Sequence, residues 1–284
     1  MLCSQDWLVE NLNVRCVRVF DCTITMVQQP MGRSIVKDGF EAWQKAHVPG
    51  SQYLNMFTEL SAPTDKIAYG LPIAERVQSV MRRFGVNHDD TIVLYGSGYL
   101  GPVTRTWWVL KASGARDVRV LDGGFEGWTE ASLPVSSRST LVDEGSFLAA
   151  ARPAMVASIT DVEKAIYRRD TALVNALSPE QFSGLGGAHY GRPGRIPRSK
   201  SVPFRSLFKE GTSWFRDLDE ITHIFEAQDV LHKDKIINYC GGGIAGSGTV
   251  FALHLIGRDD ALLYDGSLIE WCTDPKRPLV VDAS

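Results

Sequence analysis

The residues best suited to chemistry surround Cys240, in the run Cys240-Gly-Gly-Gly-Ile-Ala-Gly246. Residues 235–239 before it predict a buried strand, and Ser247 begins a segment with apolar residues at helical spacing. In such a position, glycines let backbone N–H groups turn toward one point, and the helix dipole adds partial positive charge. Both effects favour a thiolate, so we interpret Cys240 as a nucleophile.

The other four cysteines, at positions 3, 16, 22 and 272, have no comparable glycine loop. The total of five is odd, no Cys-x-x-Cys pair occurs and the histidines are not clustered. The sequence therefore indicates neither a disulfide framework nor a metal site, and we expect no cofactor. The thiols should be mostly reduced, and the cysteine chemistry should depend on Cys240 alone.

The chain repeats itself once, with corresponding segments in the same order in its two halves. The pairs are 4–12 with 158–166, 17–21 with 172–175, 47–51 with 195–199, 91–95 with 235–239, and 120–128 with 263–271. Each half alternates short apolar strands with amphipathic helices, which is typical of a parallel sheet covered by helices. We predict two similar α/β domains, 1–140 and 156–284, joined by a linker at 141–155. The alternative is one large domain in which this segment is a surface loop.

Several motifs, taken together, resemble the tandem-domain rhodaneses, the thiosulfate and 3-mercaptopyruvate sulfurtransferases. They are His47-Val-Pro-Gly-Ser51, Trp107-Trp108, Leu121-Asp-Gly-Gly-Phe-Glu-Gly-Trp128, the duplication itself, and a cysteine-led loop in the second half only. The resemblance covers nearly the whole chain. It implies two rhodanese-like domains, each with a central parallel sheet flanked by helices, and Gly96 stands in the first half at the place of Cys240.

The resemblance also implies a sulfurtransferase with a ping-pong mechanism. Cys240 would take a sulfane sulfur from a small anionic donor such as thiosulfate or 3-mercaptopyruvate and hold it as a persulfide. It would then pass the sulfur to cyanide or to a thiol, including the thiol of a protein acceptor. The loop residues that would surround the persulfide are Gly241, Gly242, Gly243, Ile244, Ala245, Gly246 and Ser247.

Two departures from the family pattern bear on the substrate. Thiosulfate-preferring members tend to carry basic residues directly after the cysteine, and mercaptopyruvate-type members tend to carry serine at the place of Gly242; here Gly241 and Gly242 follow Cys240. The frequent Asp-x-Arg at the end of the first strand of the active half is Asn175-Ala-Leu177 in this chain. The sequence therefore leaves the physiological donor and acceptor open.

A basic segment, residues 192–209, precedes the catalytic strand, and no acidic residue occurs between Glu180 and Glu210. Its positive residues are Arg192, Arg195, Arg198, Lys200, Arg205 and Lys209. Arginine binds a sulfonate or carboxylate through paired hydrogen bonds. We predict that Arg192 or Arg195 faces Cys240 and holds the anionic donor. The alternative is a solvated basic loop or a surface for a partner protein.

Three other functions fit parts of the sequence. Gly96-Ser-Gly98-Tyr-Leu-Gly101 matches the dinucleotide-binding fingerprint, but the repeat explains these glycines without a cofactor. A cysteine phosphatase would need an arginine six positions after the nucleophile, and position 246 is glycine. A rhodanese scaffold that serves only for binding or regulation remains the alternative to an enzyme.

The overall charge argues for small-molecule partners. A net charge of −3 and a sequence pI near 6.1 provide no long-range attraction to nucleic acid or acidic membranes. Residues 1–9 lack the features of a secretory signal, and no run of about 18 apolar residues predicts a membrane span. We expect a cytoplasmic protein.

Overall fold

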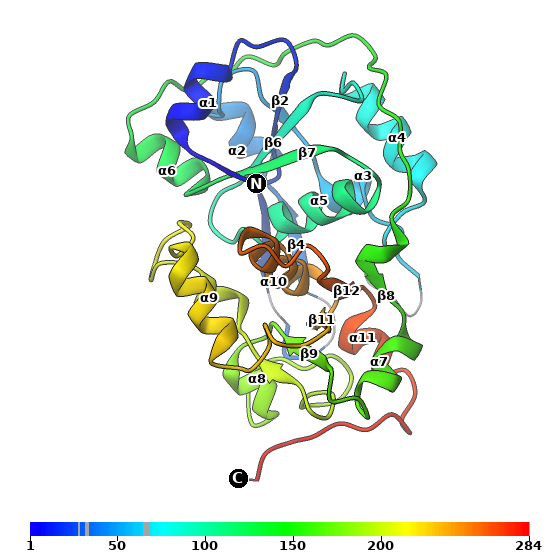
Figure 1. The fold of residues 1–284 in the computed structure, drawn as a ribbon. Helices are drawn as coiled ribbons and strands as arrows, with labels where there is room; N and C mark the ends of the chain where they lie inside the picture. Colours follow the sequence, from blue (N-terminus) through cyan, green and yellow to red (C-terminus); the bar gives the residue numbers. More distant parts are fainter. Residues whose placement is uncertain (28, 32–33, 65–66, 68, 284) are drawn as a thin grey trace.

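The computed structural model describes residues 1–27, 29–31, 34–64, 67 and 69–283. The chain forms two α/β units, one from each half, and they lie one above the other in Figure 1. Each half has a five-stranded sheet. None of the described helices is long and apolar enough to cross a membrane.

The sheet of the first half has the strand order β1-β7-β6-β2-β5, and all of its paired strands are parallel. Its strands are β1 (Leu2–Cys3), β2 (Val17–Asp21), β5 (Gln52–Tyr53), β6 (Thr91–Tyr95) and β7 (Asp117–Leu121). Its helices are α1 (Gln5–Asn11), α2 (Phe40–Lys45), α3 (Met56–Glu59), α4 (Ala74–Arg83), α5 (Gly101–Ala112) and α6 (Gly124–Glu130). Strand β6 is apolar on both faces because helices cover both sides of the sheet.

The sheet of the second half has the order β10-β9-β11-β12-β8, which is the same topology. Its strands are β8 (Val156–Ala157), β9 (Thr171–Asn175), β10 (Lys200–Ser201), β11 (Lys235–Tyr239) and β12 (Leu262–Tyr264). Its helices are η1 (Pro153–Met155), α7 (Ile159–Ala165), α8 (Pro179–Ser183), η2 (Phe204–Leu207), α9 (Leu218–Glu226), α10 (Ile244–Leu255) and α11 (Ser267–Trp271). The duplication that the sequence predicted is therefore present in the topology.

The helix that follows the Cys240 loop begins earlier than the sequence predicted. Helix α10 starts at Ile244, three residues before Ser247, because Gly243 takes a left-handed conformation (φ 89°) and ends the loop there. The first helix of each half begins after a serine. Ser4 accepts the N–H of Trp7 at the start of α1, and Ser158 caps α7.

Residues 131–152 connect the two sheets without forming a helix or a named strand. This segment packs against the first half: Phe147 is buried and its N–H donates to the carbonyl of Val86, and the N–H of Arg152 donates to the carbonyl of Ala112. The domain limits 1–140 and 156–284 remain a prediction, because Phe147 and Arg152 of the predicted linker bond to the first half.

Helices α5 and α10 pack against each other and join the two halves (Figure 1). The ring of Trp107 in α5 meets Phe251 in α10 edge to face, with centroids 5.0 Å apart, and meets His254 at 5.1 Å. One hydrophobic core cluster runs through both halves. Because each helix directly follows the loop at the end of its central strand, this packing brings both loops to the junction between the halves.

A two-stranded hairpin extends from the first half toward the second. Its strands β3 (Ile24–Val27) and β4 (Ile35–Asp38) are antiparallel. Beyond β3, the carbonyl of Pro30 accepts the N–H of His189 at 3.2 Å, so the hairpin contacts the glycine-rich loop before β10. The hairpin therefore covers one side of the junction near Cys240.

Candidate active site

Cys240 lies at the end of β11 and is only 3% exposed. Its Sγ accepts the backbone N–H of Gly243 at 3.1 Å, and its own N–H donates to Oγ of Ser267 at 3.1 Å. The first turn of α10 begins immediately after Gly243, and the first N–H groups of a helix have no partner within the helix. The sulfur is thus placed among backbone donors at a helix N-terminus, which is the arrangement that stabilises a thiolate or persulfide anion.

Gly241 is required by a close contact with Tyr190. A Cβ at position 241 would lie 2.1 Å from Cζ of Tyr190, so the tyrosine ring lies directly over the loop. Helix α11 holds the loop from the other side, since the N–H groups of Leu268 and Ile269 donate to the carbonyls of Cys240 and Gly241. The loop is therefore fixed between a tyrosine ring and a helix.

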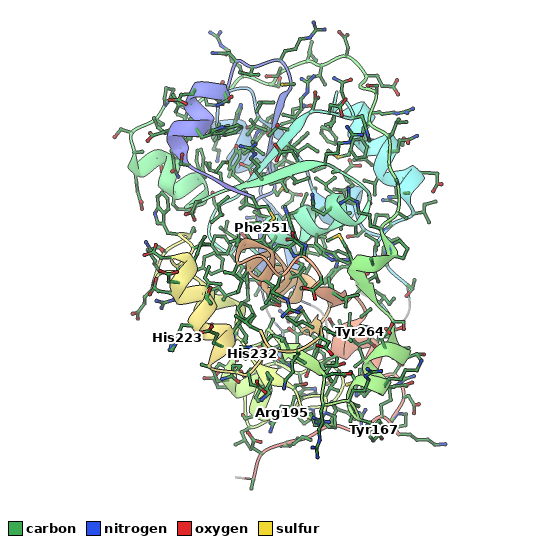
Figure 2. The ribbon with its side chains drawn as sticks, viewed as in Figure 1. Tyr167, Arg195, His223, His232, Phe251 and Tyr264 are labelled. Carbon is green, nitrogen blue, oxygen red and sulfur yellow. The ribbon has the colours of Figure 1, made fainter. Side chains whose placement is uncertain are left out.

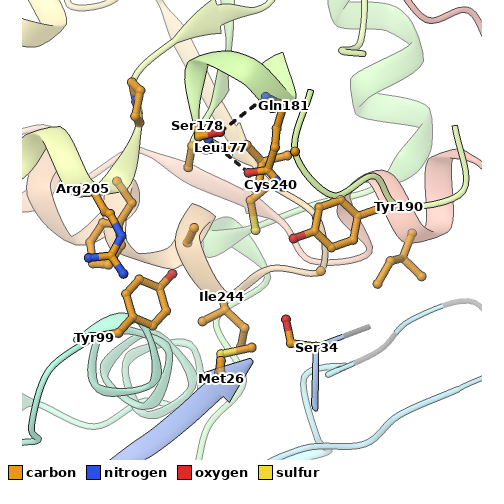
Figure 3. A pocket seen from close by; sticks show the side chains of 18 of the residues that line it. Met26, Ser34, Tyr99, Leu177, Ser178, Gln181, Tyr190, Arg205, Cys240 and Ile244 are labelled. Atoms are coloured by element: carbon orange, nitrogen blue, oxygen red, sulfur yellow. Dashed lines mark hydrogen bonds between the residues drawn. The ribbon is translucent and has the colours of Figure 1, made fainter. Parts of the chain in front are cut away.

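A cavity of about 280 Å³ opens over Cys240 at the junction of the two halves (Figure 3). The first half contributes Met26, Ser34, Tyr69 and Tyr99. The second half contributes Ala176, Leu177, Ser178, Gln181, Gly187, Tyr190, Pro203, Phe204, Arg205, Cys240, Gly241, Gly242, Ile244, Ala245 and Ile269. Figure 3 shows Tyr99 and Met26 on one side of the space and Cys240 with Tyr190 on the other. The half without a nucleophile thus supplies one wall of the cavity.

Arg205 is the one charged side chain among the described residues that line this cavity. It is exposed, and its Cζ lies 5.4 Å from the ring centre of Tyr99. Burial, followed by the nearby Cys240 sulfur, raises the pKa of Tyr99 well above its usual value. The Tyr99 hydroxyl therefore stays protonated over the physiological range and can donate a hydrogen bond to a ligand.

The predicted loop residues divide into two groups in the structure. Gly241, Gly242, Ile244 and Ala245 line the cavity, and Gly243 donates to the sulfur. Gly246 and Ser247 lie inside α10 instead, and neither lines the cavity. A Cβ on Gly246 would lie 2.9 Å from Leu263, and Oγ of Ser247 donates to the carbonyl of Ile244. These two residues therefore support the loop by packing.

Neither Arg192 nor Arg195 reaches the cavity, which corrects the prediction that one of them faces Cys240. The guanidinium of Arg192 donates to the backbone carbonyls of the C-terminal segment, at positions 274, 275 and 277. Arg195 forms an ion pair with Asp282 at 2.7 Å and stacks over Phe182. Figure 2 places Arg195 at the end of the second half that is far from Phe251 and the junction. Both arginines are used to hold the C-terminal segment.

Asn175 takes the same structural role in the second half that Asp21 takes in the first. Its Oδ1 accepts the N–H of Leu177 at 2.9 Å, and Oδ1 of Asp21 accepts the N–H of Thr23 at 2.8 Å. Both side chains close the turn after a central strand. The departure from Asp-x-Arg therefore preserves this turn while leaving no arginine at position 177.

The two fully buried cysteines of the first half are poor nucleophiles. Burial raises the pKa of Cys3 to about 12 and raises that of Cys22 still further. All five cysteines are free. Cys240 is the cysteine that lines the cavity.

The residues that sequence analysis missed come mainly from distant parts of the chain. Tyr99 and Met26 belong to the other half, and their approach to Cys240 depends on the packing of α5 against α10. Arg205 belongs to the basic segment, but the sequence predicted Arg192 or Arg195 as the residue that holds the donor. A sequence signal for it exists only in retrospect, since it is the second residue of the short helix η2, which begins at Phe204.

The family model of the rhodanese-like domain matches this chain twice, at residues 4–131 and at residues 158–274. The two matched ranges cover both α/β halves, and the cysteine-led loop lies within the second range. The chain belongs to the rhodanese family. It contains two rhodanese-like domains, as the sequence predicted.

Relatives over most of the chain are sulfurtransferases. The 3-mercaptopyruvate sulfurtransferase of Escherichia coli strain K12 is 29% identical over 94% of this chain and 92% of its own length. The human 3-mercaptopyruvate sulfurtransferase is 28% identical over 83% and 80%, and the Arabidopsis thaliana thiosulfate/3-mercaptopyruvate sulfurtransferase 2 is 26% identical over 99% and 86%. The crystal structure of SseA from Escherichia coli superposes with a TM-score of 0.81 at 27% identity, over 94% of this chain and 98% of that one.

These comparisons confirm the predicted enzyme class, a sulfurtransferase. They give no support to the alternative of a non-catalytic binding module. A small sulfur donor and a thiophilic acceptor follow as the general classes of substrate.

Proposed function

We propose that Cys240 carries the transferred sulfur as a persulfide. The observation that carries this proposal is the contact of its Sγ with the N–H of Gly243 at 3.1 Å, at the start of α10 and open to the cavity. A bound sulfane sulfur would lie toward the cavity, where the loop and the first turn of the helix present further backbone donors.

The reaction has two displacement steps. The Cys240 thiolate attacks the outer sulfur of the donor, so that a Cys–S–S bond forms while the donor's own bond to that sulfur breaks. Its electron pair leaves with the donor fragment, as sulfite from thiosulfate or as the enolate of pyruvate, which is then protonated, from 3-mercaptopyruvate. An acceptor thiolate or cyanide next attacks the outer sulfur and releases the Cys240 thiolate.

The cavity favours a small monoanionic donor such as 3-mercaptopyruvate over the dianion thiosulfate. Its walls are mostly aromatic and aliphatic, and Arg205 at the mouth is its charged lining residue. Taking a second negative charge into such a space costs desolvation that one arginine offsets only in part. The Escherichia coli and human relatives are named for 3-mercaptopyruvate, and the Arabidopsis thaliana relative is named for both donors.

We also infer that the protein works in a reducing compartment such as the cytoplasm. Five free cysteines, one of them exposed at position 16, favour a place where thiols stay reduced. The acceptor would be a small thiol, cyanide or the thiol of another protein.

The proposal is tested by intact-protein mass spectrometry after incubation with 3-mercaptopyruvate. The wild type should gain the mass of one sulfur atom, and Cys240→Ser should gain none and lose turnover. Cys272→Ser is the matched control, because Cys272 is partly exposed and close to the second-half core but does not line the cavity. Sulfur found on another cysteine in an active Cys240→Ser protein would overturn the assignment.

A further inference from the structure

A buried ion pair joins the first domain to the loop of Cys240. Arg105, in α5 of the first domain, places Nη1 2.6 Å from Oδ1 of Asp265 in the second domain. The Arg105 side chain is completely buried, and that of Asp265 is 10% exposed. Burying two charges costs free energy unless each of them is well bound.

The first domain holds both partners of this pair. Arg105 also donates to the backbone carbonyl of Tyr69, and its Cζ lies 4.6 Å from the ring centre of Trp108. The second carboxylate oxygen of Asp265 accepts the N–H of Leu71 at 2.7 Å. A carboxylate of the catalytic domain is therefore bound at both oxygens by groups of the domain that has no nucleophile.

The ion pair lies directly against Gly243. A Cβ at this glycine would be 3.0 Å from Oδ1 of Asp265 and 3.1 Å from Nη1 of Arg105. Gly243 is the residue whose N–H donates to Sγ of Cys240, and its φ of 89° is left-handed. The pair thus supports the loop at the residue that directly contacts the sulfur.

The matching place in the first domain has no such pair. Asp122 corresponds to Asp265 in the repeat, and it accepts the N–H of Phe215 from the second domain at 3.0 Å. Arg105 is the fifth residue of α5, and the fifth residue of α10 is Gly248, which packs against Phe204. Both aspartates therefore join the domains, but among the residues that the structure describes the buried Arg105 lies beside the loop that carries the cysteine and has no counterpart beside the other loop.

We propose that Arg105 and Asp265 are positioning residues for sulfur transfer. Their ion pair keeps Gly243 in the conformation that directs its N–H at the sulfur of Cys240. The reactivity of Cys240 thereby depends on the docking of the first domain. This inference rests on the proposed role of Cys240 as the sulfur carrier.

The test uses Arg105→Gln combined with Asp265→Asn, which removes both charges and leaves neither one buried alone. Asp122→Asn is the control, because it weakens the corresponding contact between the domains at a residue that does not line the cavity. In the double variant, kcat should fall about tenfold or more while KM changes less than about threefold, since the substrate contacts remain. The Asp122 variant should keep a kcat within about twofold of the wild type.

A second readout is the rate at which iodoacetamide alkylates Cys240 in the folded protein. This rate should fall with kcat in the double variant and stay unchanged in the control. Alkylation needs no persulfide, so it separates the two proposals. A wild type that transfers no sulfur would contradict the role proposed for Cys240. A dependence of the alkylation rate on the ion pair would still support the positioning role of Arg105 and Asp265.

If the double variant does not fold, Arg105→Lys takes its place, because lysine keeps the charge but loses the geometry of the guanidinium. It should show the same separation of kcat from KM at a smaller size. Variants that fold and match the wild type in both kcat and alkylation rate would overturn the proposal. So would a loss of activity that only follows the loss of folded protein.

Discussion

The two loops that follow the central strands occupy matching places but differ in length and in the groups that their backbone N–H groups contact. Loop 96–100 and loop 240–243 each contain a left-handed glycine, Gly98 (φ 69°) and Gly243 (φ 89°), and each leads into a long buried helix. In the first domain the N–H of Gly98 donates to Oε1 of Glu126 at 2.8 Å. In the second, the N–H of Gly243 donates to the sulfur of Cys240.

This difference separates the loop that we propose carries the sulfur from its counterpart in the first domain. Both loops direct a backbone donor at an acceptor, as expected of a turn before a helix N-terminus. In the first domain the protein's own carboxylate fills that place. At the position of Glu126 in the repeat the second domain has Ile269, which lines the cavity and leaves the donors to the sulfur.

The largest effect should come from Gly241→Ala. Its Cβ would lie 2.1 Å from Tyr190, so the loop or the ring must move, and the sulfur would lose its place among the donors. We expect kcat/KM to fall by about a hundredfold or more, equivalent to roughly 2.7 kcal/mol. Steady-state kinetics with 3-mercaptopyruvate and cyanide measure it.

Ser97→Ala is the matched control for that variant, since Ser97 follows Gly96 as Gly241 follows Cys240. It should leave kcat/KM nearly unchanged. Equal losses in both variants would mean that the two loops contribute alike, which would contradict the comparison.

The next largest effect should come from placing a carboxylate beside the second loop, as Glu126 stands beside the first loop. Ile269→Glu would place a carboxylate beside Cys240, where it would compete for backbone donors and repel an anionic donor. Activity should fall about tenfold or more. Ile269→Gln has nearly the same shape without the charge and should lose much less, and similar losses in the two variants would show that size and not charge separates the domains.

A smaller effect is expected at the mouth of the cavity. Arg205→Ala should raise KM for 3-mercaptopyruvate about tenfold, the lower end for a hydrogen bond to a charged group, because Arg205 is exposed. Arg192→Ala is the contrasting variant: it should leave KM unchanged and lower the melting temperature, since Arg192 binds the C-terminal segment. An increase in KM for Arg192→Ala alone would restore the sequence-based assignment.

Local sequence patterns were enough to predict the duplication and the parallel sheets, and they single out Cys240 as the candidate nucleophile. Cys240, its strand and its glycines are adjacent in the chain, so their geometry follows from a few residues. The start of α10 was predicted three residues late, because the left-handed turn at Gly243 is a backbone property that composition does not specify. The fold was therefore predictable where the determinants are local.

The walls of the site were not predictable in the same way. The sequence shows how many arginines the basic segment contains, but not where their side chains point. The directions of Arg192 and Arg195 depend on contacts with a C-terminal segment about 80 residues away in sequence. Tyr99 reaches the cavity only because α5 packs on α10. Such long-range contacts leave no periodic signal in a single sequence.

The smallest effect concerns the first helix of each domain, where the two halves again differ. In the second domain, Ser158 and Asp161 form a capping box at the start of α7, and Asp161 also binds Lys235 at 3.0 Å. In the first domain, Ser4 caps α1 without this reciprocal bond, and Asp6 stands elsewhere in the first turn. The second domain therefore has a cap that depends on an ionised carboxylate.

Hydrogen bonds from Ser158, followed by Lys235, lower the pKa of Asp161 from 3.8 to about 2. Because the folded pKa lies below the unfolded value, the contribution is complete at neutral pH, declines as the pH falls through about 4, and is gone below about 2. The Asp161 side chain is 37% exposed, so solvent screens its interactions and we expect Asp161→Asn to cost only about 0.5–1 kcal/mol at pH 7. Urea unfolding at pH 7 and at the lowest pH where the protein stays folded should show the difference shrinking. A destabilisation by Asp161→Asn that is constant with pH would mean that the cap does not need the charge.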